Sequence, residues 1–160
     1  MIKAFLRGGA TSIRAWAPRS LGTGSSASDT TAVGNTIPQP GDILLEGSLE
    51  YRRNLIRFAG NIQMAVFLDA GNVWKWHQIN IPERYNKSNF DIGRFYKEIA
   101  VGTGFGLRWD LSFFLFRFDW GIKVVDPGRP EGDRYVLNRF SLRRGQPYGM
   151  NLNFGIGYPF

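Results

Sequence analysis

The chain has no cysteine and a single histidine among its 160 residues. Without cysteine it can form neither a disulfide scaffold nor a thiolate metal site, and cysteine catalysis is excluded. No stretch approaches the roughly 18 consecutive apolar residues of a membrane-spanning helix, so a helical membrane protein is excluded as well. The amino terminus also lacks the apolar stretch of about 7–15 residues that a secretory signal needs.

Glycine and aromatic residues are abundant. The chain contains 20 Gly, 13 Phe, 6 Tyr and 5 Trp, yet its mean hydropathy is −0.23. The apolar residues must therefore be dispersed among polar ones, which is typical of β structure.

The net charge of +7 is spread along the chain: residues 1–40 carry four basic and one acidic side chain, and residues 41–160 carry sixteen and twelve. Nucleic-acid binding favours a basic face with interleaved aromatics, which this pattern does not form, so no nucleic-acid partner is predicted. A basic loop surface facing anionic lipid headgroups or a polyanionic cell surface fits the charge better.

The first 28 residues contain arginine and serine but no acidic residue, and so superficially fit a mitochondrial transit peptide. The alternative is that Met1 is an internal start and the chain is the carboxy-terminal piece of a longer protein. We expect the second, because of the number of strands described next.

From residue 41 onward apolar residues recur with period two, which predicts five strands: residues 42–53, 62–74, 97–111, 113–125 and 151–160. One face of these strands is bulky and apolar. It carries Leu45, Leu49, Tyr51, Met64, Val66, Leu68, Val101, Phe105, Leu107, Trp109, Phe114, Phe116, Phe118, Trp120, Leu152, Phe154 and Ile156. The opposite face mixes glycine with charges of both signs. It carries Glu46, Glu50, Arg52, Asp69, Gly102, Gly104, Gly106, Arg108, Arg117, Asp119, Lys123, Asn151, Asn153, Gly155 and Gly157.

Strands of about 11–15 residues are long for a soluble sheet, whose strands cluster near 5–6 residues. A bilayer-spanning strand needs about 9–11 residues, apolar toward lipid and polar toward the lumen. The predicted fold is therefore all-β, an antiparallel transmembrane β-barrel.

The links between the strands alternate in length. Residues 54–61 and the turn around Ser112 are short, whereas residues 75–96 and 126–148 are long. In outer-membrane barrels, long external loops alternate with short periplasmic turns in the same way. This alternation places the carboxy terminus at the periplasm. Interfacial aromatics are then expected at both rims: Trp74, Trp76 and Tyr96 at one, and Trp109, Tyr158 and Phe160 at the other.

Five strands cannot close a barrel, because the smallest membrane barrels have eight. An open edge in lipid leaves backbone groups unpaired at a cost of several kcal/mol each. Missing upstream strands or other subunits must complete the barrel, and we expect missing strands. Residues 1–40 would then be a loop segment and residues 41–160 the last five strands of a larger barrel.

The most distinctive motif is Gly8-Gly9 followed by Ser12-Ile13-Arg14-Ala15-Trp16. Further motifs are Leu49-Glu50-Tyr51-Arg52, Phe67-Leu68-Asp69-Ala70-Gly71-Asn72-Val73-Trp74, the glycine-rich segment that ends in Arg108, Phe116-Arg117-Phe118-Asp119-Trp120-Gly121 and the terminal strand that ends in Phe160. In this order they resemble the outer-membrane protein-assembly superfamily that includes BamA and TamA. Ala15 and Trp16 stand where the motif of this family most commonly has Gly-Phe, and this difference favours a TamA-like branch.

The resemblance covers nearly the whole chain. It implies a loop folded into the lumen, followed by the last five strands of a sixteen-stranded barrel in the bacterial outer membrane. It also implies a protein, not an enzyme, that inserts or translocates other outer-membrane or surface proteins. A weak strand seam would perform this work, at the terminal assembly signal Gly155, Gly157, Tyr158 and Phe160. Its partners would be lipid, nascent outer-membrane proteins, upstream strands and periplasmic modules. The alternative is a pore, receptor or secretion channel for a fused or partner domain.

Arg14 needs carboxylate partners if its loop enters the lumen, because an unpaired buried guanidinium is costly. Glu50 and Asp69 lie on the polar faces of adjacent predicted strands, so we expect them to hold Arg14 by charge-assisted bonds. We call this trio the Arg14 clamp. The alternative is that Glu50, Asp69, Arg117 and Asp119 form a solvated ladder in the lumen. Arg108, Arg117 and Asp119 are in either case expected to be lumen charges.

Other motifs carry less. Gly102, Gly104 and Gly106 alternate within a strand and lack the strand–turn–helix setting of a nucleotide site, so we expect them to ease curvature. His77 stands alone in a loop and predicts no metal site. Ser12 and Ser20 have no base partner, so no hydrolase triad is predicted. Residues 126–134 hold three acids that could bind calcium weakly, although a plain turn fits them better. No cofactor is predicted.

Overall fold

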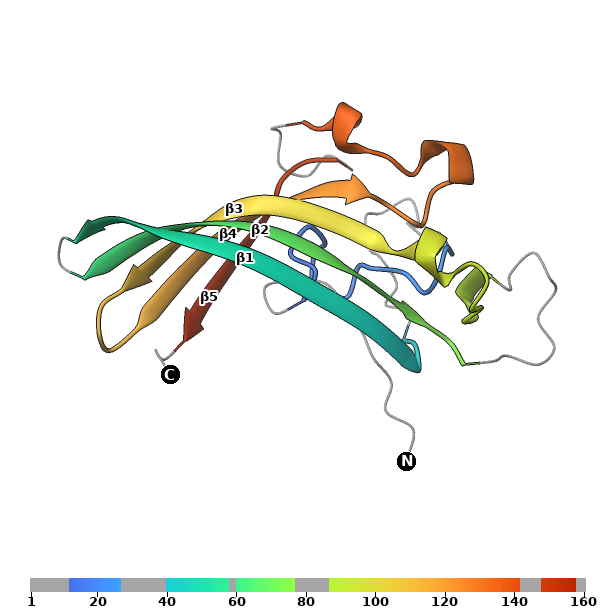
Figure 1. Ribbon diagram of the computed structural model, residues 1–160, viewed down its shortest axis with the longest axis horizontal. Coiled ribbons are helices and arrows are strands. Elements are labelled where there is room, and N and C mark those ends of the chain that lie inside the picture. The colour runs from blue at the N-terminus through green and yellow to red at the C-terminus, as the bar shows by residue number, and fades with distance from the viewer. Residues whose placement is uncertain (1–11, 27–39, 58–59, 77–86, 142–147, 158–160) are drawn as a thin grey trace, which may run out of the picture.

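The computed structural model describes residues 12–26, 40–57, 60–76, 87–141 and 148–157. Five antiparallel strands form one open sheet in the order β1-β2-β3-β4-β5, shown in Figure 1. They are β1 (Ile43–Arg57), β2 (Asn61–Trp74), β3 (Ala100–Asp110), β4 (Leu115–Val125) and β5 (Asn151–Gly157). Short 3-10 helices occupy the connections: η2 (Phe95–Glu98), η3 (Glu131–Asp133) and η4 (Leu137–Arg139). The predicted all-β antiparallel fold is confirmed.

None of the helices in the described part of the chain has the length and hydropathy needed to cross a membrane.

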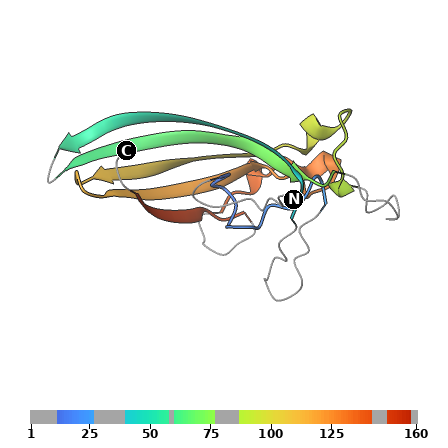
Figure 2. The same cartoon turned by 90° about the horizontal axis from the view of Figure 1, so that it is seen from below.

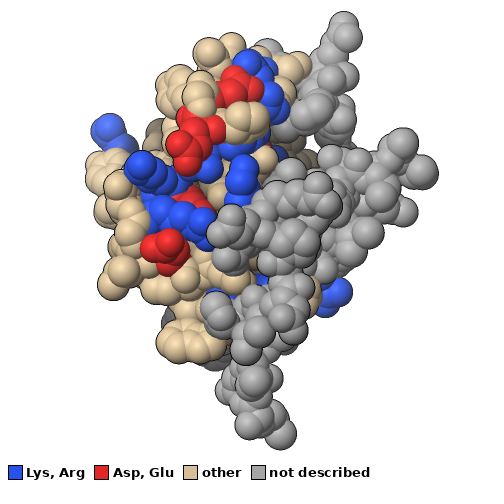
Figure 3. All heavy atoms as spheres, turned by 90° about the vertical axis from the view of Figure 1, so that its right-hand side faces the viewer, with Lys and Arg blue, Asp and Glu red and all other residues tan. Residues whose placement is uncertain are grey.

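The two ends of the sheet differ. β1 ends and β2 begins at the left of Figure 1, where β3 also turns into β4 and β5 ends. The long connections that contain η2, η3 and η4 lie at the opposite end. We call these the turn end and the loop end. Figure 3 looks onto the loop end and shows basic and acidic side chains intermingled, not gathered by sign.

Several strand bounds differ from those predicted. β1 runs on to Arg57, with a register shift between Asn54 and Ile56, so the link to β2 is shorter than the eight residues expected. β3 begins at Ala100, because η2 takes up the residues just before it. The turn from β3 to β4 holds Ser112 at a φ of 67°, with its amide donating to the Asp110 carboxylate at 2.9 Å.

The predicted division of each strand into two faces is confirmed. On the bulky face, Leu49 and Tyr51 are 73% and 71% exposed. On the opposite face, Ala65, Phe67 and Asp69 are buried. Cross-strand partners such as Phe105 and Trp120 pair in register, and their rings stack with centroids 5.1 Å apart. The sheet thus exposes apolar side chains and buries polar ones, the reverse of a soluble domain.

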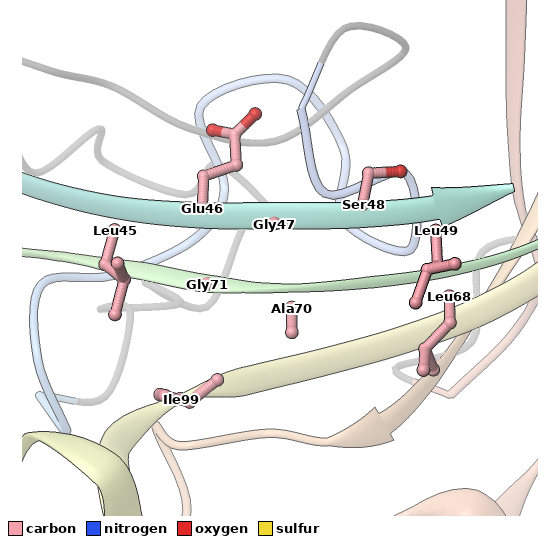
Figure 4. Close-up of a pocket in the computed structure, with 9 residues that line it drawn as sticks. All are labelled: Leu45, Glu46, Gly47, Ser48, Leu49, Leu68, Ala70, Gly71 and Ile99. Carbon is pink, nitrogen blue, oxygen red and sulfur yellow. The ribbon is translucent and has the colours of Figure 1, made fainter.

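Figure 4 shows this division on β1 and β2. Glu46 and Ser48 point to one side of β1, while the apolar side chains point to the other. On that apolar side, Gly47 pairs with Ala70, and these two small residues leave a hollow of about 460 Å³. Larger apolar side chains border it: Leu45, Leu49, Leu68 and Ile99. We call this side of the sheet the outer face and the opposite side the inner face.

Residues 12–26 lie along the inner face of the sheet, drawn in blue in Figures 1 and 2. We call this segment the inward loop. Its apolar side chains make a small core against the start of β3. The core consists of Ile13, Ala15, Trp16, Leu21 and Ala100. The inward loop is therefore what covers the polar face of the strands.

Candidate functional site: the inward loop and its anchors

Arg14 and Asp69 form the centre of the site. The Arg14 guanidinium donates to both carboxylate oxygens of Asp69, from Nε at 2.8 Å and from Nη2 at 2.7 Å. The Arg14 backbone amide donates to the same carboxylate at 3.0 Å. Such a two-pronged pairing is the geometry that arginine gives to carboxylates. Asp69 therefore fixes both the side chain and the backbone of Arg14.

Arg14 also reaches β1. Its Nη1 pairs with the carboxylate of Glu50, and its Nη2 donates to Ser48 Oγ at 3.1 Å. Ser48 in turn donates to Asp69 at 2.7 Å. The guanidinium carbon lies 3.5 Å from the centroid of the Phe67 ring, a cation–π contact. The structure thus brings together the three residues of the predicted Arg14 clamp.

Arg108 on β3 continues the network toward β4. It donates to both carboxylate oxygens of Glu50, at 3.1 and 3.0 Å, and its Nη1 lies 2.6 Å from Asp119 Oδ1. Arg117 pairs with the other oxygen of Asp119 at 3.1 Å. Arg14, Asp69, Arg108 and Asp119 are each no more than 4% exposed. These four charges are buried and each lies against an opposite charge, so they are not solvated, whereas Arg117 is partly exposed.

Burial and pairing act in opposite directions on Arg14. Burial alone would lower the pKa of its guanidinium, because desolvation disfavours the charged form. The hydrogen bonds to Asp69 and Glu50 outweigh that effect and raise the pKa above its usual value. Arg14 therefore remains charged throughout the accessible pH range.

Two glycines make room for the inward loop. A Cβ at Gly121 on β4 would lie 2.4 Å from the Arg14 carbonyl oxygen, and a Cβ at Gly102 on β3 would lie 2.5 Å from the Ala15 Cβ. Neither separation is possible for real side chains. The prediction that Gly102 eases curvature missed this use of the space, because nothing in one sequence shows that a distant loop lies against the strand.

The inward loop is also fastened to β5. Asn151 Nδ2 donates to the carbonyl oxygens of Arg14 and Trp16, each at 2.9 Å. Asn153 Nδ2 donates to the Arg14 carbonyl at 2.8 Å. The sequence placed both asparagines on the polar face but gave them no role. Their partners are backbone carbonyls, which every residue has, so the sequence does not reveal them.

A second anchor lies further along the inward loop and was also missed. Gly24 donates to the Val73 carbonyl at 2.8 Å, and Asn72 Nδ2 donates to the Gly24 carbonyl at 2.7 Å. Ser25 Oγ donates to Glu98 at 3.0 Å. The loop thus joins the last residues of β2 to the end of η2.

Trp74 belongs to this second anchor. It is fully buried, and its Nε1 donates to Glu98 Oε2 at 2.7 Å. The prediction that Trp74 is an interfacial aromatic is therefore wrong, since the inward loop and η2 enclose the end of β2. Trp76 and Tyr96 are exposed at that end as expected, and Trp109 is partly exposed on the outer face near the turn end.

The remaining predicted residues fall into two groups. Ser12 Oγ donates to Glu46 at 3.3 Å, Ile13 and Trp16 are buried, and the Trp16 ring lies 5.0 Å from Lys123 Nζ. Gly155 and Gly157 lie in β5. Gly8, Gly9, His77, Tyr158 and Phe160 lie outside the described residues.

Two of the three acidic residues considered for calcium binding are engaged with basic groups. Asp126 pairs with Lys123 at 3.3 Å, and Asp133 accepts from Arg129 and Arg139. Within the described ranges, no three His, Cys, Asp or Glu side chains are grouped so as to hold a metal ion.

The geometry agrees with a comparison to known families. The family model of the Omp85 superfamily domain matches residues 1–160. No curated protein matches the chain. Omp85 superfamily proteins are β-barrel proteins of the bacterial outer membrane, and in general they work in protein assembly or translocation there.

Proposed function

Because the chain belongs to the Omp85 superfamily and is an outer-membrane protein, we propose that it inserts or translocates other outer-membrane proteins through a weak seam at β5. The role is not enzymatic: β5 offers its backbone edge to an incoming strand, which pairs with it by β-augmentation. Assignment to a TamA-like branch, which is based on the dipeptide Ala15-Trp16, stays a prediction.

The length and place of β5 support this proposal. Over the described residues it pairs with β4 at seven positions, Asn151–Gly157, whereas β2 and β3 pair at eleven. β5 lies at the edge of the sheet, and an edge strand is a template for further pairing. Gly155 and Gly157 add no side-chain contacts, and Pro159 lacks a backbone donor.

The partners follow from the two faces and the two edges. The apolar outer face fits lipid. β1 and β5 are the edges of the sheet, and edges cannot stay unpaired in hydrocarbon. We therefore infer that upstream strands complete a larger barrel and that nascent outer-membrane proteins compete for the β5 edge. The family resemblance adds periplasmic modules that deliver these proteins. In this reading residues 1–40 are a loop segment, and residues 41–160 contain the last five strands of the barrel.

Site-specific photo-cross-linking tests the seam. A photoreactive residue replaces Phe154 on β5 or, as the matched control, Phe105 on the central strand β3. Both side chains are on the outer face and about half exposed. In cells that are exporting outer-membrane proteins, we expect cross-links to those proteins from position 154 at several times the yield from position 105. Equal yields would contradict the seam, and ion conductance by the same protein would then favour a pore or secretion channel.

A further inference from the structure

The inner face of β5 contacts the inward loop. Along β5 the inward positions are Asn151, Asn153, Gly155 and Gly157, so only the two asparagines bring polar side chains to this face. Their amide groups donate three hydrogen bonds to two carbonyls of the inward loop, at 2.8–2.9 Å. The loop therefore holds the edge strand from inside, in addition to the ladder with β4.

Gly121 makes this contact possible. It is the cross-strand partner of Asn151, and its missing side chain leaves the space that the Arg14 carbonyl occupies. With a methyl group there, the carbonyl would be pushed away from the sheet and out of reach of Asn151. The same residue of the loop is tied on its other side to β1 and β2 through the Arg14 guanidinium. Arg14 thus spans the sheet from β1 to β5.

We propose that the inward loop is a strap for the edge strand: its seating holds β5 against β4 through Asn151 and Asn153, and its release frees β5. Asn151 and Asn153 are positioning residues, since they hold β5 in place by bonding to the loop backbone. That release of β5 admits an incoming strand rests on the proposed function. The coupling of loop and strand does not, and it is reciprocal, because whatever loosens one must loosen the other by the same factor.

The test is hydrogen exchange of the membrane-inserted protein, comparing the double variant Asn151→Ala/Asn153→Ala with Gly155→Ala. Gly155 is on the same face of the same strand, and a Cβ there would lie no closer than 3.8 Å to Arg117. The double variant is expected to exchange its β5 amides about tenfold faster, because three hydrogen bonds are lost. Residues 12–16 should exchange faster by a similar factor, while β2 and β3 keep their protection.

Gly121→Ala provides a second route that leaves both asparagines in place. It is expected to speed exchange in β5 as the double variant does, because it displaces the Arg14 carbonyl. If β5 exchanges at the Gly155→Ala rate in both the double variant and Gly121→Ala, with β2 and β3 protected, the strap is overturned.

Cross-linking from position 154 separates the strap from the proposed function. With the strap and the function both correct, the double variant raises the cross-link yield severalfold over the otherwise wild-type protein. Faster β5 exchange with no cross-link in any variant supports the strap and overturns the seam function. Wild-type cross-links that the double variant leaves unchanged, together with unchanged β5 exchange, support the function and overturn the strap.

Discussion

Within the described residues, the pairings around Asp69 and around Asp133 are alike in chemistry and unlike in setting. In one, Asp69 accepts a two-pronged pairing from Arg14 across 55 residues of sequence. In the other, Asp133 accepts from Arg129 and Arg139, four and six residues away, at the loop end. The side chain of Asp69 is 1% exposed and that of Asp133 is 33% exposed.

The number of hydrogen bonds in each cluster does not show which cluster contributes more to stability. Exposed ion pairs are screened by water and contribute about 0–1 kcal/mol, whereas breaking a buried pair leaves a charge without compensation. The buried cluster also joins segments far apart in sequence, so its loss releases the inward loop. The exposed cluster joins neighbouring turns within one connection.

Arg14→Ala should give the largest effect. Asp69 would keep a buried charge without its arginine, which costs about 3–5 kcal/mol, whereas Glu50 would still pair with Arg108 and Arg52. Hydrogen exchange of residues 12–26 should become fast, and assembly activity should fall. Unchanged loop protection together with unchanged activity would eliminate the Arg14 clamp.

Arg14→Lys separates charge from geometry and should have an intermediate effect. Lysine keeps the positive charge, but its ammonium cannot pair with Asp69 through two parallel donors or reach Ser48 at the same time. We expect a loss of about 1–3 kcal/mol, as for buried hydrogen bonds to charged groups, measured by urea unfolding in lipid vesicles. Stability equal to that of the wild type would mean that charge alone holds the loop.

Gly102→Ala should have a smaller effect than Arg14→Ala. The added methyl would overlap Ala15 in a packed interior, where overpacking costs about 1–3 kcal/mol. The matched control is Gly47→Ala on the outer face, where a Cβ meets nothing within 4 Å. Hydrogen exchange of residues 12–16 should rise in the first variant only. A similar rise in both would show that the glycines act through the strands and not through room for the loop.

Asp133→Asn should give the smallest effect. The hydrogen bond from Arg129 lowers the pKa of Asp133 below its usual value, so the carboxylate contributes stability above the unfolded-state pKa of about 3.9. That contribution is lost as the pH falls through the lower folded-state pKa. The difference in thermal unfolding between wild type and variant should therefore begin to shrink below about pH 4 and vanish below the folded-state pKa. A difference that persists in strong acid would contradict this account.

Most of the fold followed from period-two alternation. The faces of β2 and β3 could be assigned residue by residue, because side chains such as Phe67 and Arg108 alternate with the apolar residues of the outer face. Strand ends were harder to place. Alternation continues from Glu98 into β3, yet Glu98 lies in η2, because its carboxylate accepts from Trp74 and Ser25 of other segments.

The site was predictable only in part. Arg14, Glu50 and Asp69 could be matched largely because the family resemblance implies a loop inside the lumen, where a guanidinium needs carboxylate partners. Asn151, Asn72 and Gly121 could not, since an amide that donates to a backbone carbonyl, or a glycine that yields space, has partners defined only by the folded chain. Alternation assigns a face but not what covers it.

The hydrogen bonds between the inward loop and β5 also order events in time. They join residues 137 and 139 positions apart, the longest separations among the described side-chain hydrogen bonds. Contacts this distant form late, because the intervening chain must first be arranged. The inward loop is therefore seated fully only after β5 has joined the sheet, so a seated loop reports that the last strand of this sheet is in place.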